Sequence, residues 1–371
     1  MAKSEIEDAL LNLVRVGIGH PAGALPNPVD WPALQTLAAR QGLTAVVLDG
    51  LDKLPQTAYS MPNDLKRQWI GDVLQGYEFR YERYRKTIGE MAAFYNAHGF
   101  RMMVLKGYAC SLDWPKPEHR PCGDIDIWQF GQYKEADAAL TDWFRSSRGS
   151  RVQGVQEFKI DDSHQHHTVF AWNGFTVENH YDFVNVVAHA SSRRLERVFK
   201  QLGADDTHFV EVDGEKVYLP SPNLHALFLL RHMVSHFAST QLNLRQILDW
   251  GFFVKAHTHE IDWEWLLDKL DEYHMTDFFA CLNAICVEDM GFLPTIFPSV
   301  PSDAALKERI LNDTLSPEFG EVEPKGLVAR VAFKYRRWQA NAWKQRLCYG
   351  ESRWNVFWSG VWNHVLKPSS I

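Results

Sequence analysis

The first hundred residues place apolar side chains at the spacing of a helix. The segment that begins at Asp30 has a capping aspartate followed by Pro32 in the first turn, a combination typical of helix starts. Residues 62–98 repeat apolar positions every three to four residues, and Gly99 follows them as a stop. These patterns predict an N-terminal helical region over residues 1–98.

After Gly99 the pattern changes to short apolar runs and alternating positions, which favour strands. RMMVLKG (101–107) is a short apolar run that ends in glycine, and DIDIWQF (124–130) alternates apolar and polar residues with a period of two. Other segments follow the same rules. The further strand candidates are 155–161, 166–172 and 175–183, and the expected helices are one or two turns in 108–114, residues 134–147 and a helix near 185–200.

Two dipeptides mark tight turns between strands. Asn173-Gly174 separates two strand candidates, and Asp213-Gly214 lies in the middle of HFVEVDGEKVYL. Such pairs favour hairpins because both residues readily adopt positive φ. From Ser221 the helical spacing returns and continues to the end, with residues 316–326 as the best linker candidate.

The chain is therefore predicted to be α+β, with a mixed sheet between N- and C-terminal helical regions. Its 371 residues are too many for one small core, so several substructures are expected. We expect three regions, which are a helical region over residues 1–98, an α/β core over 99–220 and a helical region over 221–371.

Composition narrows the class of protein. The net charge of −7 disfavours a nucleic-acid protein that works by overall charge. The stretch 334–362 mixes basic and aromatic residues and is compatible with an RNA surface. We interpret it instead as buried tryptophans with lysine and arginine on the solvent side.

Cysteine usage and the N-terminal segment bear on the compartment. The five cysteines are odd in number and form no CxxC, so a disulfide framework is disfavoured and a reducing cytoplasm is expected. Glu5, Glu7 and Asp8 interrupt the apolar run that a signal peptide needs. No run approaches the ~18 apolar residues of a membrane span. We therefore expect a cytoplasmic protein with no membrane partner.

Two aspartates lie one residue apart in the alternating segment. Residues i and i+2 of a strand point to the same face, about 7 Å apart, so Asp124 and Asp126 face one way while Ile125 and Ile127 face the core. Two close carboxylates repel one another unless a cation lies between them, and magnesium takes hard oxygen ligands. The pair indicates a Mg²⁺ site; the alternative is a strand edge with solvated aspartates.

Three neighbouring features strengthen the cation hypothesis, and each has an ordinary alternative. Lys106 and Gly107 end an apolar strand where a positive charge and backbone N–H groups suit phosphate, although a plain strand-to-helix turn has the same sequence. Arg120, four residues before Asp124, has the reach for a triphosphate or is a surface arginine. Glu178, in a later strand, completes a carboxylate triad, serves as a base, or is an exposed glutamate.

The order of these motifs resembles the polymerase beta-like nucleotidyltransferase superfamily. The closer likeness is to its poorly characterised branch of bacterial nucleotidyltransferase-like proteins, over roughly residues 30–260. The matching segments are Leu105-Lys106-Gly107, Arg120-Pro121-Cys122-Gly123-Asp124-Ile125-Asp126, Glu178-Asn179-His180, the pair His166 and His167, the pair His232 and His236, and a helix with Leu244, Arg245, Leu248 and Asp249.

The resemblance implies a nucleotidyltransferase-like core and a set of site residues. It implies that Asp124, Asp126 and Glu178 are catalytic and hold Mg²⁺, with Mn²⁺ as a substitute. It also implies that the triphosphate and its metal are bound by Lys106, Gly107, Arg120 and His180. The reaction would be attack on the α-phosphate of a nucleoside triphosphate, such as ATP, with release of pyrophosphate. A small-molecule acceptor is favoured over protein or nucleic acid.

The remaining histidines are interpreted as structural. His164, His166 and His167 are compatible with zinc, but no second ligand group has convincing spacing, so polar residues of a strand and turn are favoured. His232 and His236 are four apart on a helix and lack the glutamate of HExxH, so hydrogen bonding or packing is favoured over metal ligation.

Two other classes of function remain open from the sequence. The first is a non-catalytic nucleotide-binding or accessory protein on the same scaffold, which has no need of three convergent carboxylates. The second is a metal-dependent phosphohydrolase, which usually brings more histidine–aspartate ligand pairs. The acceptor, the preferred base and the oligomeric state do not follow from the sequence.

Overall fold

The structure is a computed structural model that describes residues 3–21, 23–148, 158–186, 189, 191–320 and 324–350. Within these residues the chain divides into two compact units that do not follow the order of the sequence. The sheet unit contains Arg80–Leu112 and the described part of Cys122–Phe228, and the helical unit contains residues 3–79, Asp113–Pro121 and residues 229–350 as far as they are described. Each unit is considered by itself.

The sheet unit is built on a mixed sheet whose strands follow the order β3-β4-β2-β1-β6-β5. The strands β2 and β4 are parallel, as are β1 and β6, and the other neighbouring pairs are antiparallel. The predicted α+β class with a mixed sheet is therefore confirmed. The strand bounds are β1 Met103–Val104, β2 Ile125–Trp128, β3 His167–Trp172, β4 Phe175–His180, β5 Phe209–Val212 and β6 Glu215–Tyr218.

Both predicted hairpins are present in the sheet. Asn173 and Gly174 join β3 to β4 with φ of 50° and 81°, and Asp213 and Gly214 join β5 to β6 with φ of 53° and 84°. Positive φ at both central residues gives the turn a twist that matches the twist of the flanking strands. These turns fix the register of each hairpin.

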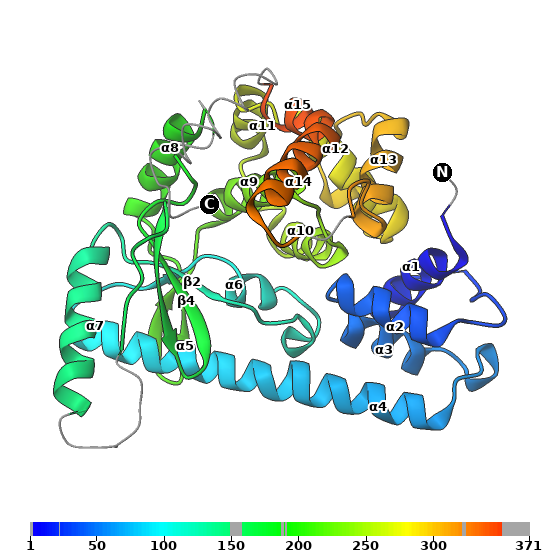
Figure 1. The fold of residues 1–371 in the computed structure, drawn as a ribbon, viewed down its shortest axis with the longest axis horizontal. Coiled ribbons are helices and arrows are strands. Elements are labelled where there is room, and N and C mark those ends of the chain that lie inside the picture. The colour runs from blue at the N-terminus through cyan, green and yellow to red at the C-terminus, as the bar shows by residue number, and fades with distance from the viewer. Residues whose placement is uncertain are drawn as a thin grey trace. The chain divides into compact units, whose positions relative to one another are not determined.

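Two helices supply most of the remaining core of the sheet unit (Figure 1). From α5, the side chains of Tyr84, Ile88, Met91 and Tyr95 are fully buried against the strands, and from α7 Leu140 joins them. Burying such apolar side chains is the main favourable contribution to folding. The helices of this unit are α5 Phe79–Ala97, α6 Tyr108–Ser111, α7 Tyr133–Arg148 and α8 Ser192–Ala204.

The helical unit contains the N-terminal helices and most of the C-terminal half. Asp30 caps the second helix by accepting a hydrogen bond from the Ala33 N–H at 3.1 Å, as its sequence predicts. The elements are α1 Glu5–Gly17, α2 Trp31–Arg40, α3 Thr44–Lys53, α4 Asn63–Val73, α10 Leu244–His257, α11 Trp263–Glu272, α12 Thr276–Ala284, α13 Ala304–Leu315, α14 Leu327–Ala340 and α15 Ala342–Tyr349, with short helical turns at Gln56–Ala58, Pro117–His119 and Pro294–Ile296 and π-helical turns at Leu74–Glu78 and Ile285–Asp289. The helix α9 Pro222–Ser239 begins in the sheet unit and belongs to the helical unit from Leu229.

Several expected elements differ in detail from the prediction. The long helix expected over 62–98 contains the π-helical turn Leu74–Glu78, and the helix expected near 185–200 begins at Ser192. In the strand candidate 155–161, residues 155–157 lie outside the described residues, and Asp161 forms an isolated bridge with Val169. Residues 321–323 of the linker candidate and 351–362 of the basic stretch also lie outside them.

Among the helices of the described residues, none combines the length and the apolar character that a transmembrane span requires.

Candidate active site

The register of two parallel strands brings the predicted acids together. Asp126 on β2 lies directly opposite Glu178 on β4, and Trp128 lies opposite His180. Because residues i and i+2 share a face of a sheet, the side chains of Asp126, Glu178 and His180 point to one side. One oxygen or nitrogen from each of these three lies within 4.8 Å of the others. The sheet thus assembles two carboxylates and an imidazole from separate parts of the chain.

Asp126 is the buried centre of this group. Its residue is 3% exposed, and its Oδ1 lies 3.0 Å from the Lys106 Nζ and 3.1 Å from the His180 Nε2. Burial alone raises the pKa of a carboxyl, but the neighbouring Lys106 and His180 outweigh it and hold the pKa of Asp126 well below its usual range. Asp126 is therefore a carboxylate balanced by two cationic neighbours.

The hydrogen bonds of His180 decide which of its nitrogens faces the acids. Its Nδ1 lies 3.2 Å from the carbonyl oxygen of Asp182, which only accepts, so Nδ1 carries a proton. Its Nε2 lies 3.1 Å from Asp126 Oδ1 and 3.5 Å from Glu178 Oε2. Burial lowers the pKa of His180, but the two carboxylates outweigh burial and raise it. The carboxylates thus favour the charged form of the ring, and Nε2 is the nitrogen that faces them.

Asp124 completes the predicted trio at the edge of β2. It is exposed, and its pKa is raised by partial burial and then by repulsion from Glu178 and Asp126. The register brings Asp126 and Glu178 side by side, and Asp124 lies two residues before Asp126, within electrostatic range of both. The roles of all three in catalysis and metal binding stay predictions.

Packing around position 107 requires a glycine, in addition to the role at the phosphates that the sequence predicts for Gly107. Its φ is 61°, and a Cβ at this position would lie 2.4 Å from the hydroxyl of Tyr84. That hydroxyl donates to the carbonyl oxygen of Asp124 at 2.9 Å. Gly107 thus lets Tyr84 reach and fix the backbone that carries Asp124. Lys106, its neighbour, is engaged with Asp126, and its predicted contact with phosphate is untested.

Arg120, predicted to bind the triphosphate, belongs to the helical unit. Its Nε and Nη2 donate to the two oxygens of Asp249 at 2.7 and 2.9 Å, and the residue is 5% exposed. Trp114 Nε1 donates to the same carboxylate at 2.9 Å. Arg120 is thus not a surface arginine but half of a buried bidentate pair, and its role at a triphosphate stays a prediction.

The histidines before β3 lie beside this group, which sequence spacing did not show. His167 at the start of β3 pairs with His180 at the end of β4, and one nitrogen from each of His166, His167 and His180 lies within 4.8 Å of the others. Burial and neighbouring positive groups lower the pKa of His166 to about 3, and burial is the main cause of a pKa of about 4 for His167. The signal that could have found them is the register fixed by the Asn173-Gly174 turn.

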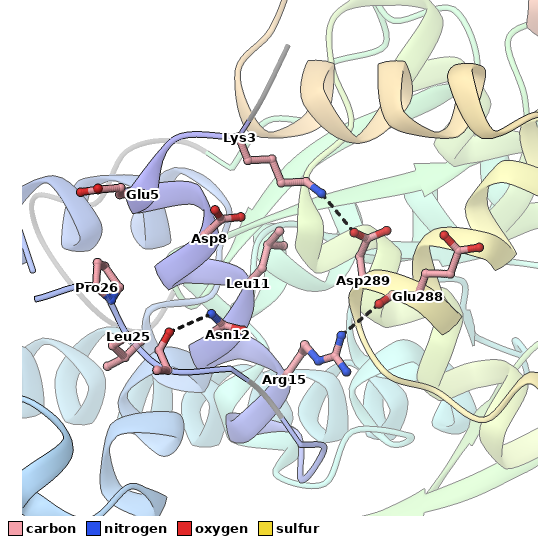
Figure 2. Close-up of a pocket in the computed structure, with 11 residues that line it drawn as sticks. Lys3, Glu5, Asp8, Leu11, Asn12, Arg15, Leu25, Pro26, Glu288 and Asp289 are labelled. Carbon is pink, nitrogen blue, oxygen red and sulfur yellow. Dashed lines mark hydrogen bonds and ion pairs between the residues drawn. The ribbon is translucent and has the colours of Figure 1, made fainter.

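The helical unit contains a histidine pair and a charged cavity, and both are less suited to metal binding than the group around Asp126. His232 and His236 on α9 have ring centroids 4.4 Å apart and form a small surface pair. A cavity of about 430 Å³ is lined by charged residues of α1 and the turn before Met290 (Figure 2). One of its acids, Asp289, is already paired, because Lys3 lies 3.3 Å from one oxygen of its carboxylate and Lys307 lies 2.6 Å from the other.

Comparison with known proteins gives one match. A protein-family model described as an uncharacterised nucleotidyltransferase matches residues 27–291, a range that contains all six strands and each of the acids and histidines of the group. No curated protein and no solved structure matches the chain.

Proposed function

The chain belongs to the family of uncharacterised nucleotidyltransferases, and we propose that it transfers a nucleoside monophosphate from a nucleoside triphosphate to a small-molecule acceptor with the help of Mg²⁺. The observation that carries the proposal is the register that sets Asp126 opposite Glu178 on parallel strands. Asp124 is near enough for repulsion from both carboxylates to contribute to its raised pKa. Two carboxylates on one face of a sheet, with a third two residues before one of them, suit a divalent cation and its triphosphate.

The chemistry of the donor set fits a divalent cation. Asp126 and Glu178 each present an oxygen to the same imidazole nitrogen, at 3.1 and 3.5 Å, and Asp124 adds an exposed carboxylate two residues before Asp126. Mg²⁺ held by Asp124, Asp126 and Glu178, or Mn²⁺ in its place, would neutralise charge that develops on the triphosphate oxygens. The Nδ1 of His180 donates to the carbonyl oxygen of Asp182, and this hydrogen bond fixes the ring whose Nε2 contacts Asp126 and Glu178.

The remaining roles belong to side chains of the sheet unit. The Lys106 ammonium is 3.0 Å from Asp126, and a cation on that carboxylate would free the ammonium to face the triphosphate. Glu178, which is partly exposed, is placed to accept the proton of the acceptor hydroxyl. The hydroxyl oxygen then bonds to the α-phosphorus, the bond to the β-phosphate oxygen breaks, and pyrophosphate leaves with its electron pair. Positioning supplies most of the rate.

A second candidate is a non-catalytic nucleotide-binding or accessory protein on the same scaffold. The observation that favours it is the contact between Lys106 and Asp126, since a lysine that neutralises a buried carboxylate removes the need for a metal ion there. The two candidates differ in whether binding of the nucleotide requires a divalent cation.

A thermal-shift measurement distinguishes the two candidates. We expect one or more nucleoside triphosphates to raise the melting temperature only when Mg²⁺ or Mn²⁺ is present, and Asp124→Asn to abolish the shift. Asp142→Asn, which changes an exposed carboxylate on α7, is the matched control and should behave as wild type. A shift that persists without metal and in Asp124→Asn would support the binding protein instead.

Transfer itself needs a direct assay. Triphosphates labelled at the α-phosphate, incubated with the protein, Mg²⁺ and a small-molecule fraction of cell extract, should give a new labelled product and free pyrophosphate. Label found in protein or nucleic acid would redirect the acceptor, and no label anywhere would contradict transfer. We further propose a cytoplasmic location, where nucleoside triphosphates are available to such an enzyme.

A further inference from the structure

The three histidines beside the carboxylates come from two strands and meet at one point. His167 and His180 are directly opposite residues of the β3–β4 hairpin, and directly opposite side chains lie about 4.5–5.5 Å apart at Cβ. The carbonyl oxygen of His166 accepts from the backbone N–H groups of Tyr181 and Asp182 at 3.1 and 3.2 Å. The backbone of all three histidines is therefore fixed by the hairpin, not by a loose loop.

Their rings face one another closely. The ring centroids of His166 and His167 are 4.4 Å apart, and those of His166 and His167 lie 5.4 and 5.2 Å from that of His180. One nitrogen from each lies within 4.8 Å of the others. A zinc ion bound to imidazole at about 2.0–2.1 Å requires nitrogens closer than this, which small rotations of the rings would supply.

The hydrogen-bonding state of the rings points to a ligand that is not part of the chain. Among the described residues, the Nδ1 atoms of His166 and His167 are buried and have no hydrogen-bond partner, and His167 is only 7% exposed. Buried polar atoms are nearly always satisfied in folded proteins. A site with buried, unpartnered imidazole nitrogens is suited to a metal ion that prefers nitrogen ligands.

A carboxylate lies beside two of the three rings. Glu178 Oε1 lies 3.9 Å from His167 Nε2, and its Oε2 lies 3.5 Å from His180 Nε2. Three imidazoles and one carboxylate are a donor set typical of zinc and related transition metals, whereas Mg²⁺ prefers oxygens. The second shell is also present, since His180 donates its Nδ1 proton to the Asp182 carbonyl.

We propose that His166, His167 and His180, with Glu178, form a nitrogen-rich site for a transition-metal cation such as Zn²⁺, next to the carboxylates of Asp124 and Asp126. The site shares Glu178 and His180 with the proposed nucleotidyl-transfer site, but all its ligands come from the chain, so that Zn²⁺ binding can be measured without a nucleotide. The sequence lacked a second ligand group for the His166 and His167 pair, and β4 provides it as His180.

Cobalt and zinc binding to the full chain test the proposal. Metal-free protein should take up one equivalent of Co²⁺ with the visible absorption of a four-coordinate site, and Zn²⁺ should displace it while millimolar Mg²⁺ should not. We expect His166→Phe, which keeps a ring of similar size, to weaken Zn²⁺ binding at least about 10-fold. His232→Phe, which removes one histidine of the α9 pair, is the matched control and should bind as wild type.

Further readouts separate this site from folding and from the proposed reaction. X-ray absorption of the zinc-loaded wild-type protein should show about three imidazole ligands, and it requires no variant to fold. Asp124→Asn should keep the Zn²⁺ site even where it loses nucleotide binding. Absence of Co²⁺ and Zn²⁺ binding to the wild type, equal affinity in His166→Phe, or a metal shell without imidazole would each overturn the proposal.

Discussion

At the scale of single residues, the site depends on how the charge of Asp126 is balanced. The carboxylate is buried between Lys106 and His180, at 3.0 and 3.1 Å, so its negative charge is compensated without a metal ion. The proposed divalent cation would therefore compete with Lys106 for the oxygens of Asp126. Replacing Lys106 should therefore increase the effect of a divalent cation on the stability of the protein.

The change Lys106→Met should make the protein depend on divalent cations for stability. Without metal we expect a loss of up to about 3–5 kcal/mol in the free energy of unfolding, the range for a broken buried pair, reduced because His180 still contacts Asp126. Added Mn²⁺ should restore more stability to the variant than it adds to wild type. Urea denaturation with and without Mn²⁺ measures both effects.

Lys86→Met, on the exposed side of α5, is the control for the loss of a lysine as such. It should change stability by less than about 0.5 kcal/mol. An equal response of Lys106→Met and wild type to Mn²⁺ would contradict competition at Asp126.

A second residue-scale prediction concerns pH and a histidine of the helical unit. His119 Nδ1 lies 2.6 Å from Asp49 Oδ2, and its Nε2 lies 3.2 Å from Glu78 Oε1. Burial lowers its pKa, but the two carboxylates outweigh burial and raise it above the ordinary 6.5. The stabilisation is fully present below about pH 6.5 and is lost as the pH rises through the higher folded-state pKa.

Urea denaturation of wild type and His119→Gln across this range tests the sign. The difference in unfolding free energy between them should be largest in mild acid and should shrink as the pH rises. Other histidines titrate too, so His259→Gln, at an exposed position, serves as the reference and should track wild type. A difference that grows with pH would show that His119 is neutral in the fold.

At the scale of elements, the turns and the short strand–helix junction define the sheet unit. Gly174 and Gly107 both have positive φ, but a Cβ at Gly174 would meet only the end of Arg83 at 3.7 Å, whereas at Gly107 it would meet the Tyr84 hydroxyl at 2.4 Å. The two glycines therefore share a positive φ and differ in the close contact, and Gly107 also has a ψ of −96°.

Alanine substitution at these glycines should have unequal effects. We expect Gly174→Ala to cost about 1–2 kcal/mol, the penalty for a left-handed L-residue, and Gly107→Ala to cost clearly more. Adding Tyr84→Phe to Gly107→Ala should recover the excess, because the next nearest atom of that ring is 3.6 Å away. Chemical denaturation of the single and double variants measures this, and a double variant no more stable than Gly107→Ala would exclude the proposed clash.

At the scale of elements, the sequence predicted features that depend on neighbouring residues, such as turns, but not those that depend on distant segments. The Asn173-Gly174 and Asp213-Gly214 turns were predicted correctly because positive φ is a property of the dipeptides themselves. The strand order could not be predicted, since β2 pairs with β4 across the intervening α7 and β3. The trio of acids was predicted from a family pattern, but the neighbouring histidines depended on the pairing of His167 with His180.

The same limit explains why the pairing of Arg120 with Asp249 was not predicted. Its partner Asp249 is 129 residues away along the chain, and no periodicity connects the two. The sequence could assign Arg120 a motif, but only the fold shows that its guanidinium is engaged within the helical unit. Ion pairs between distant segments are set by tertiary packing, which single-sequence patterns do not contain.

At the scale of the whole molecule, the two units are each assembled from separated segments. The core of the sheet unit needs Tyr84, Ile88, Met91 and Tyr95 of α5, all fully buried. These residues precede residue 99, where the sequence pattern changes from helix to strand. The change from helical to strand spacing at residue 99 therefore does not mark a boundary between domains. It marks the end of α5, which belongs to the same core as the strands.

Fragments of the chain test this dependence. We expect residues 99–220 alone to lack a cooperative unfolding transition, because the face of α5 that covers the strands is missing, and residues 80–228 to show one. Circular dichroism and urea denaturation of both fragments compare them under the same conditions. Cooperative unfolding of the shorter fragment at the same midpoint would contradict the role given to α5.

The discontinuity of the helical unit also bears on how the protein is made. The side chain of Gln41 donates to the carbonyl oxygen of Thr314 and accepts from the Leu244 N–H, each at 2.8 Å. When α1, α2 and α3 leave the ribosome, neither partner has been translated. The nascent chain must therefore hold these helices incomplete while the sheet unit is synthesised, so they reach their final state only after residues far later in the chain have been made.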